Sequence, residues 1–104
     1  MKWNSLSNGA IIQEIGKRVK EIRLDKNLTQ QELAKMSGIS LFTVAQIERG
    51  KPVSLAMLVP VIRELRLIDN LELLLPQREI SPIELLKAKG KVPKRASRIG
   101  KKRL

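Results

Sequence analysis

The stretch TQQELAKMSGISLFTVAQIERG, residues 29 to 50, decides the fold. It predicts two short helices joined by a tight turn. Thr29 can cap the first helix, and Glu32 stands at the third helical position, where it completes a capping box. Gly38 falls where the chain must turn sharply, at a position that often needs a positive φ. The sequence therefore predicts a first helix from about residue 30 to the turn at Gly38.

The second helix of this stretch is predicted to be presented to a partner rather than buried. Ser40 caps it, and it ends near Arg49, with Gly50 just past its end. Val44 and Ile47 are three residues apart and should face the core. The residues left to face outward are Ser40, Leu41, Thr43, Gln46 and Arg49. Two short helices in this arrangement form the helix-turn-helix pattern, in which the second helix enters the major groove of DNA.

The segment resembles the Cro/C1-type helix-turn-helix family, also called the XRE family of bacterial and phage regulators. The resemblance covers roughly residues 11 to 68. It is carried by Leu28-Thr29-Gln30, Glu32-Leu33-Ala34, Gly38-Ile39-Ser40, Thr43 and Ile47-Glu48-Arg49-Gly50. It implies an all-α fold, a five-helix domain like that of lambda repressor, to which this chain adds a short C-terminal helix and a basic tail.

By this resemblance, the side chains that reach the base edges are those of Ser40, Leu41, Phe42 and Gln46. Leu41 and Phe42 depart from the commoner family pattern, which has polar or basic residues there. They cannot donate hydrogen bonds to bases, but they can pack against thymine methyl groups, whereas Gln46 can make a bidentate contact, best with adenine. For Phe42 two alternatives remain open: it folds back into the core, or it binds a protein partner.

Other residues are predicted to contact the DNA backbone. Gln30 matches a family position that grips a phosphate, and a helix N-terminus favours such a contact. The further candidates are Lys17, Arg18, Thr43, Arg49 and Lys51, for which the alternative is an ordinary solvated side chain. Arg23 and Glu48 resemble a structural pair that ties the first helix of the domain to the end of its third.

The rest of the chain predicts further helices around this motif. Residues 1–10 form an extension, 11–76 the DNA-binding domain, 77–90 a short C-terminal helix, and 91–104 a tail without periodicity. The first helix should run from Ile11 to about residue 24 or 26. A fourth helix should follow a cap at Ser54, although Pro60 inside it leaves open a later start. Its predicted inner face comprises Leu55, Leu58, Val59, Ile62 and Leu65.

A fifth, leucine-rich helix is predicted to begin at Asp69 and end at Pro76. Four leucines lie in the five residues 71–75, more than one face of a short helix can bury, so some should stay exposed. Ser81, Pro82 and Glu84 together predict the start of a sixth helix that ends near Gly90.

The charge is concentrated at the C-terminal end. Residues 1–86 carry 12 Lys or Arg and all 10 acidic residues, whereas residues 87–104 carry nine Lys or Arg and no acid. Such asymmetry suggests a nucleic-acid or acidic-surface partner for the tail, and contact with DNA phosphates is the leading interpretation. The alternatives are RNA binding and a solvated end that contributes only solubility. The predicted tail phosphate contacts are Lys94, Arg95, Arg98, Lys101, Lys102 and Arg103.

Composition argues against several other classes of protein. The 104 residues include no His, Cys or Tyr, so the usual catalytic bases, thiolates and metal ligands are missing, and an enzyme, a metal site or a cofactor is not expected. The sequence pattern also shows no sensor domain for a small molecule, no membrane span and no signal peptide. We therefore expect a cytoplasmic protein, and the family resemblance implies a bacterial or phage origin and association with the nucleoid.

The leading functional hypothesis is a DNA-binding repressor that acts as a homodimer on an inverted repeat, with half-sites ~34 Å apart. The leucines of residues 71–75 and the helix after Ser81 are the predicted dimer contacts. The alternative is an antitoxin that resembles those of the Hip type, which bind a kinase-like toxin and repress their own operon.

Overall fold

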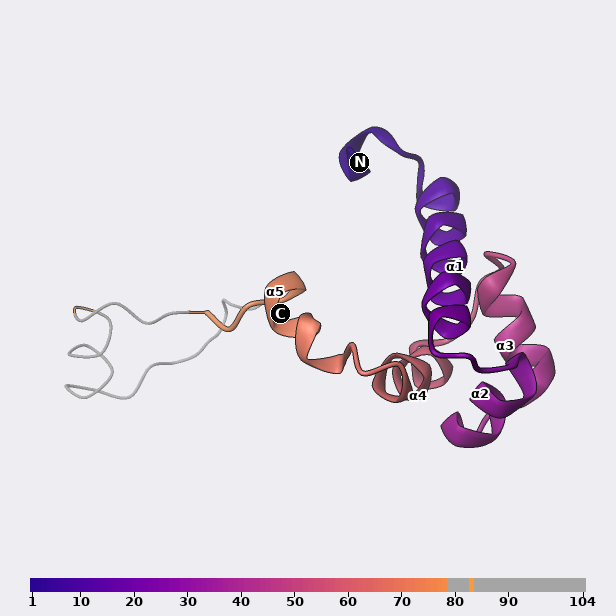
Figure 1. Ribbon diagram of the computed structural model, residues 1–104. Coiled ribbons are helices and arrows are strands. Elements are labelled where there is room, and N and C mark those ends of the chain that lie inside the picture. The colour runs from indigo at the N-terminus through magenta and orange to yellow at the C-terminus, as the bar shows by residue number, and fades with distance from the viewer. Residues whose placement is uncertain (79–82, 84–104) are drawn as a thin grey trace. The chain divides into compact units, whose positions relative to one another are not determined.

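The structure is a computed structural model that describes residues 1–78 and Ile83 (Figure 1). The chain divides into two units, Met1–Leu74 and Leu75–Leu104. In the second unit the described residues, 75–78 and Ile83, are exposed. The predicted sixth helix and the basic tail lie outside the described residues, apart from Ile83, which is helical.

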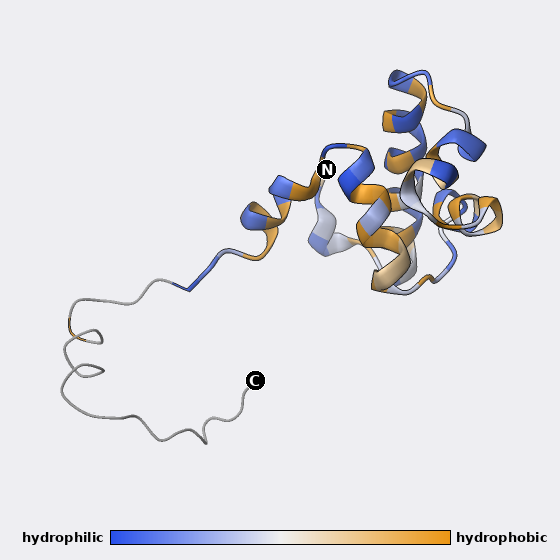
Figure 2. Ribbon diagram, turned by 90° about the horizontal axis from the view of Figure 1, so that it is seen from below, coloured by the Kyte–Doolittle hydropathy of each residue, from blue (hydrophilic) through white to orange (hydrophobic). Residues whose placement is uncertain are grey.

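Within residues 1–78 all regular structure is helical, as predicted, and no helix there is long and apolar enough to cross a membrane. The elements are η1 (Trp3–Ser5), α1 (Asn8–Asp25), α2 (Gln30–Ser37), α3 (Leu41–Glu48), α4 (Leu55–Glu64), η2 (Ile68–Asn70) and α5 (Leu71–Leu74). Hydrophobic and hydrophilic residues alternate along the ribbon (Figure 2), as expected of helices with one buried face.

Helix α1 begins earlier than the sequence predicted. It starts at Asn8, and the Ser7 hydroxyl caps it by accepting a hydrogen bond from the backbone N–H of Ala10 at 3.1 Å. The predicted extension therefore contains the first turn of α1 as well as the 3-10 turn η1. The other end is as expected, since α1 ends at Asp25. Asn27 follows in a left-handed conformation with φ 59°.

The caps of α2 and α3 are those that the sequence predicted. Thr29 Oγ1 accepts from the N–H of Glu32 at 3.0 Å, and Glu32 Oε1 accepts from the N–H of Thr29 at 2.8 Å. Gly38 ends α2 with φ 72°, a left-handed conformation that glycine adopts without steric cost. Ser40 then caps α3 by accepting from the N–H of Thr43 at 3.0 Å. These contacts fix the turn that separates the two helices.

One hydrophobic core joins α1, α2, α3 and α4. Its buried members are Val19, Leu33, Ala34, Val44, Ile47, Val61 and Leu65. Helix α1 crosses close to the C-terminal end of α3, where Gly16 faces the backbone: a Cβ at Gly16 would collide with the carbonyl oxygen of Ile47. This close approach packs the C-terminal end of α3 against α1, and α3 also contacts α2.

Helix α4 differs in detail from its prediction. It starts at Leu55 and continues through Pro60, so the alternative of a later start is wrong. Ser54 occupies the N-cap position without a side-chain capping hydrogen bond. The predicted inner face was wrong at Leu55, which is 75% exposed, and at Val59, while Val61 is fully buried.

The end of the first unit is shorter and more irregular than predicted. Asp69 lies in the 3-10 turn η2 and not at the cap of a longer helix, and α5 is a single turn. Leu73, Leu74 and Leu75 are 86%, 71% and 72% exposed, so the prediction that several leucines would remain uncovered is confirmed.

Candidate nucleic-acid interface

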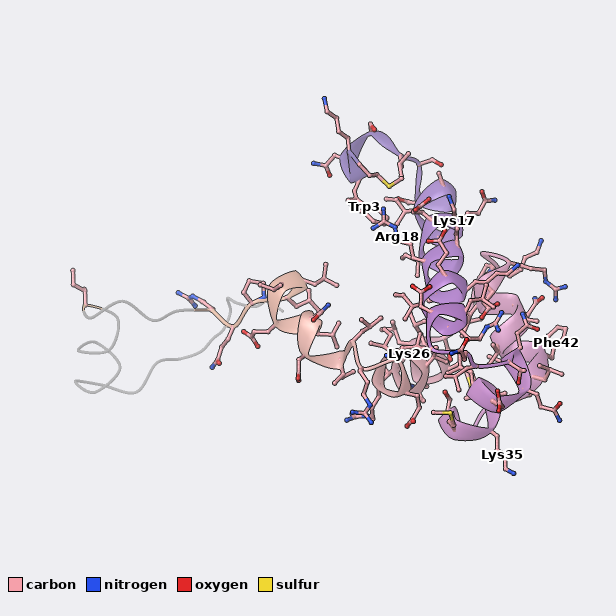
Figure 3. All side chains as sticks on the ribbon, viewed as in Figure 1. Trp3, Lys17, Arg18, Lys26, Lys35 and Phe42 are labelled. Carbon is pink, nitrogen blue, oxygen red and sulfur yellow. The ribbon has the colours of Figure 1, made fainter. Side chains whose placement is uncertain are left out.

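Helix α3 presents its N-terminal half to solvent. Phe42 is 68% exposed and Leu41 46% exposed, whereas Val44 and Ile47 are buried. In a helix, Phe42 lies about 200° around the axis from Val44, so it points away from the core when Val44 points into it. Figure 3 accordingly shows Phe42 projecting outward from the helices. The alternative in which Phe42 folds back into the core is therefore wrong.

The polar side chains at the start of α3 form a small network. Ser40 Oγ accepts the capping hydrogen bond from Thr43 and also lies 2.8 Å from Thr43 Oγ1. Because two hydroxyl groups share one hydrogen bond, one O–H hydrogen remains for an outside acceptor. Ser40 and Thr43 together can thus cap the helix and still donate to a phosphate or a base.

Gln46 and Arg49 lie on the same side of the last turns of α3. Arg49 Nη2 donates a hydrogen bond to Gln46 Oε1 at 2.7 Å. Arg49 is exposed and Gln46 half-buried. The residues are three apart, a spacing at which side chains on a helix are neighbours, so the sequence pattern contained a signal for this contact.

A buried ion pair holds the far end of α3. Arg23 Nε lies 2.6 Å from Glu48 Oε2, and Arg23 Nη2 donates to Glu48 Oε1 at 3.1 Å. Arg23 Nη1 donates to the carbonyl oxygen of Leu28 at 2.6 Å. The side chains of the pair are 7% and 2% exposed. The predicted link between the first and third helices is confirmed, and it also fixes the chain just before α2.

Gln30 belongs to the same network. Its Nε2 donates to Glu48 Oε1 at 2.9 Å, and the residue is half-buried. The sequence predicted Gln30 as a phosphate contact and missed this bond, which joins residues 18 positions apart. An amide nitrogen carries two hydrogens, so one remains for a phosphate at the N-terminus of α2.

Of the other predicted phosphate contacts, Lys17 and Lys51 are exposed. Arg18 is placed differently: its Nε donates to Glu14 Oε2 at 2.8 Å, and its guanidinium lies 4.7 Å from the ring centre of Trp3. Gly16 faces α3, and Arg18 lies about 200° further around the helix. Figure 3 shows Arg18 beside Trp3. This placement assigns Arg18 to the side of α1 that faces away from α3.

That side of α1 borders an apolar groove with a volume of about 430 Å³. The groove is lined by Trp3, Ile15, Arg18, Val19, Ile22, Leu58, Ile62, Leu67, Asn70, Leu71 and Leu74. It therefore combines side chains of α1 and α4 with those that follow α4, and Trp3 closes one part of its wall. The sequence did not predict this groove, because it depends on contacts between distant parts of the chain.

The described residues contain no group of three or more His, Cys, Asp or Glu side chains that could hold a metal ion. The predicted tail contacts, Lys94, Arg95, Arg98, Lys101, Lys102 and Arg103, lie outside the described residues.

Helix α3 follows the capped α2 after the turn at Gly38, packs against α1 and α2, and exposes its N-terminal half. This arrangement defines a helix-turn-helix protein, which reads DNA with its second helix. A family model described as helix-turn-helix matches residues 19–68. The crystal structure of the restriction-modification controller protein C.AhdI from Aeromonas hydrophila is similar, with a TM-score of 0.52 and 34% identity over 55% of this chain and 88% of that chain. No curated protein matches.

The chain belongs to the Cro/C1-type helix-turn-helix family. It is accordingly a DNA-binding transcription regulator, as the sequence predicted.

Proposed function

We propose that this regulator is a sequence-specific repressor that binds double-stranded DNA as a homodimer on an inverted repeat. The observation that carries the proposal is the exposure of Leu41 and Phe42 at the start of α3, beside the network of Ser40 and Thr43. Two adjacent large apolar side chains exposed on one helix favour an interaction surface at that place. The major groove offers one in the methyl groups of thymine.

In this proposal Ser40, Leu41, Phe42 and Gln46 contact the base edges. Leu41 and Phe42 pack against thymine methyl groups, which gives coarse discrimination. Replacing thymine by uracil removes only the methyl group, so it should weaken binding at the contacted steps.

The backbone contacts position α3 in the groove and carry little sequence information. We assign them to Gln30, Lys17, Thr43, Arg49 and Lys51, and leave Arg18 out because it is engaged with Trp3 and Glu14. Gln30 has a particular place here, since Glu48 orients its amide while the second N–H is free to donate. A phosphate held by Gln30 would thus be coupled to the buried ion pair that fixes α3.

The apolar groove and the exposed leucines support a homodimer. Leu73 is 86% exposed and Leu74 71% exposed, and the groove lies on the same unit. In a two-fold dimer the same surface of each copy forms the interface. A molecule that carries both the groove and exposed leucines can therefore pair with its own copy. A single recognition helix covers only a few base pairs, and pairing would extend the site to two half-sites ~34 Å apart.

The basic tail, residues 91–104, is proposed to add phosphate contacts, or an arm into the minor groove. Each neutralised phosphate adds about 0.9 to the slope of log K against log salt concentration. Deleting residues 91–104 should therefore weaken binding and flatten this slope. Equal slopes for the full chain and the deletion would rule out tail contacts with DNA.

In vitro selection from a random duplex pool, at about physiological salt, tests the proposed function because nonspecific phosphate binding is suppressed there. The proposal predicts enrichment of an inverted repeat with half-sites one helical turn apart. Enrichment of an unpaired site would contradict the homodimer, and no enrichment would contradict sequence-specific binding by the protein alone.

The antitoxin role stays a prediction, and the neighbouring reading frame tests it. A kinase-like product that co-purifies with this protein would support it. A restriction endonuclease or methyltransferase in that place would instead favour a role like the one stated for C.AhdI, which is a restriction-modification controller.

A further inference from the structure

The contact between Arg49 and Gln46 determines which way the Gln46 amide faces. A carboxamide has an oxygen that accepts hydrogen bonds and an NH₂ group that donates them, and the two ends are nearly equal in size. A guanidinium has only donors. The amide next to Arg49 must therefore turn its oxygen toward the guanidinium, as the 2.7 Å bond from Arg49 Nη2 to Gln46 Oε1 records.

This orientation changes what Gln46 offers to DNA. A free glutamine reads adenine by accepting from the N6 amino group with its oxygen while donating to N7 with its nitrogen. When Arg49 holds the oxygen, the amide is left with its NH₂ group to offer, and Arg49 keeps further N–H donors of its own. The two side chains together thus form a surface of donors.

We propose that Arg49 positions Gln46 so that the pair reads guanine instead of adenine. The inference rests on the proposed function and deepens it, because it concerns one base of the same DNA site. It departs from the sequence-based expectation, which assigned adenine to Gln46, and it moves Arg49 from the backbone contacts proposed above to the base contacts.

Guanine is the base that matches two adjacent donors. In the major groove it presents two neighbouring acceptors, N7 and O6, whereas adenine places an N6 donor next to its N7 acceptor. Cytosine presents a donor, and thymine presents a single acceptor beside its methyl group. A donor surface over adenine would set N–H against N–H, and a good bidentate match discriminates roughly 5- to 150-fold between bases.

The test compares the sequences selected by the wild type with those selected by variants of the two residues. Gln46→Ala identifies the base position that Gln46 reads, because the preference there is lost. Arg49→Met keeps a long side chain but has no donor, which frees the amide to turn. We expect wild-type protein to select guanine at that position and Arg49→Met to shift the ratio of guanine to adenine at least fivefold toward adenine. Arg49→Lys, which keeps donors, should retain guanine.

Loss of charge at Arg49 could also weaken binding to every sequence alike. The guanine-to-adenine ratio at one position separates the two effects, since a lost phosphate contact lowers affinity without changing that ratio. Arg63→Met removes the same charge from the exposed surface of α4 and serves as the matched control. Thermal unfolding of each variant checks that the domain is intact.

Three results would overturn the inference: adenine at the position in the wild type, an unchanged ratio in Arg49→Met, or no position whose preference depends on Gln46. Each of these can occur while an inverted repeat is still enriched, and the proposed function then stands without it. If the wild type enriches no site at all, the proposed function fails and the inference fails with it.

Discussion

Removing one member of the Arg23–Glu48 pair should destabilise the domain far more than losing an ordinary surface ion pair. Both side chains are almost fully buried, and the guanidinium makes three short contacts, two to Glu48 and one to the carbonyl oxygen of Leu28. Arg23→Met would leave a buried carboxylate whose one remaining partner among the described residues is the amide of Gln30. The expected cost is ~3–5 kcal/mol, compared with ~0–1 kcal/mol for an exposed pair.

Urea unfolding followed by far-ultraviolet circular dichroism measures this cost as a free energy. Thermal unfolding followed in the same way gives the melting temperature: at ~4–8 °C per kcal/mol for a domain of this size, that of Arg23→Met should fall by at least about 12 °C. Glu14→Gln is the matched control, because it removes the partner of Arg18, which is far more exposed than Arg23. It should cost no more than about 1 kcal/mol.

The double variant Arg23→Met/Glu48→Leu tests whether the loss of stability comes from leaving one buried charge without its partner. It removes both charges, so no uncompensated charge stays buried, and it should recover a large part of the stability lost in either single variant. Recovery should be incomplete, since Gln30 and the Leu28 carbonyl lose their partners. The reasoning is refuted if each single variant costs less than about 1 kcal/mol, or if the costs of the two single variants simply add.

Four further outcomes are expected. Gly16→Ala should cost about 1–3 kcal/mol in urea unfolding because its Cβ would force α1 away from the Ile47 carbonyl, and a stabilised protein would contradict this packing. Thr29→Ala should lose about 1 kcal/mol through the capping box, and an unchanged stability would count against that cap. Phe42→Ala should leave stability within about 0.5 kcal/mol of the wild type while weakening binding to the selected DNA. Trp3, the single tryptophan, should shift its emission to shorter wavelength as rising concentration drives dimerisation, and a constant spectrum would argue against a second copy at the groove.

The sequence predicted the helix-turn-helix unit well because its signals are local. The capping box of Thr29 and Glu32, the turn at Gly38 and the cap at Ser40 each depend on residues within a few positions of one another. The start of α1 was missed because the apolar periodicity begins only at Ile11, whereas the helix is set by a cap four residues earlier.

Features that depend on helix packing were predicted less well. Every apolar residue of α4 fits some helical face, and the crossing with α2 decides that Val61 is buried and Leu55 is not. Similarly, the bond from Gln30 to Glu48 and the contact of Trp3 with Arg18 join residues 18 and 15 positions apart. No local pattern encodes these contacts. The hydrogen bond between Arg49 and Gln46 differs, because residues three apart on a helix are neighbours.

The claim that Leu41 and Phe42 read thymine methyl groups is tested most directly by removing either side of the contact. In the selected site, each thymine is replaced by uracil in turn, and the dissociation constant is measured for the wild type and for Leu41→Ala/Phe42→Ala. A buried methyl is worth ~0.8 kcal/mol, so uracil at a contacted step should weaken wild-type binding about fourfold. The variant should bind thymine and uracil sites equally. An equal loss in both proteins, or no loss at any thymine, would contradict the claim.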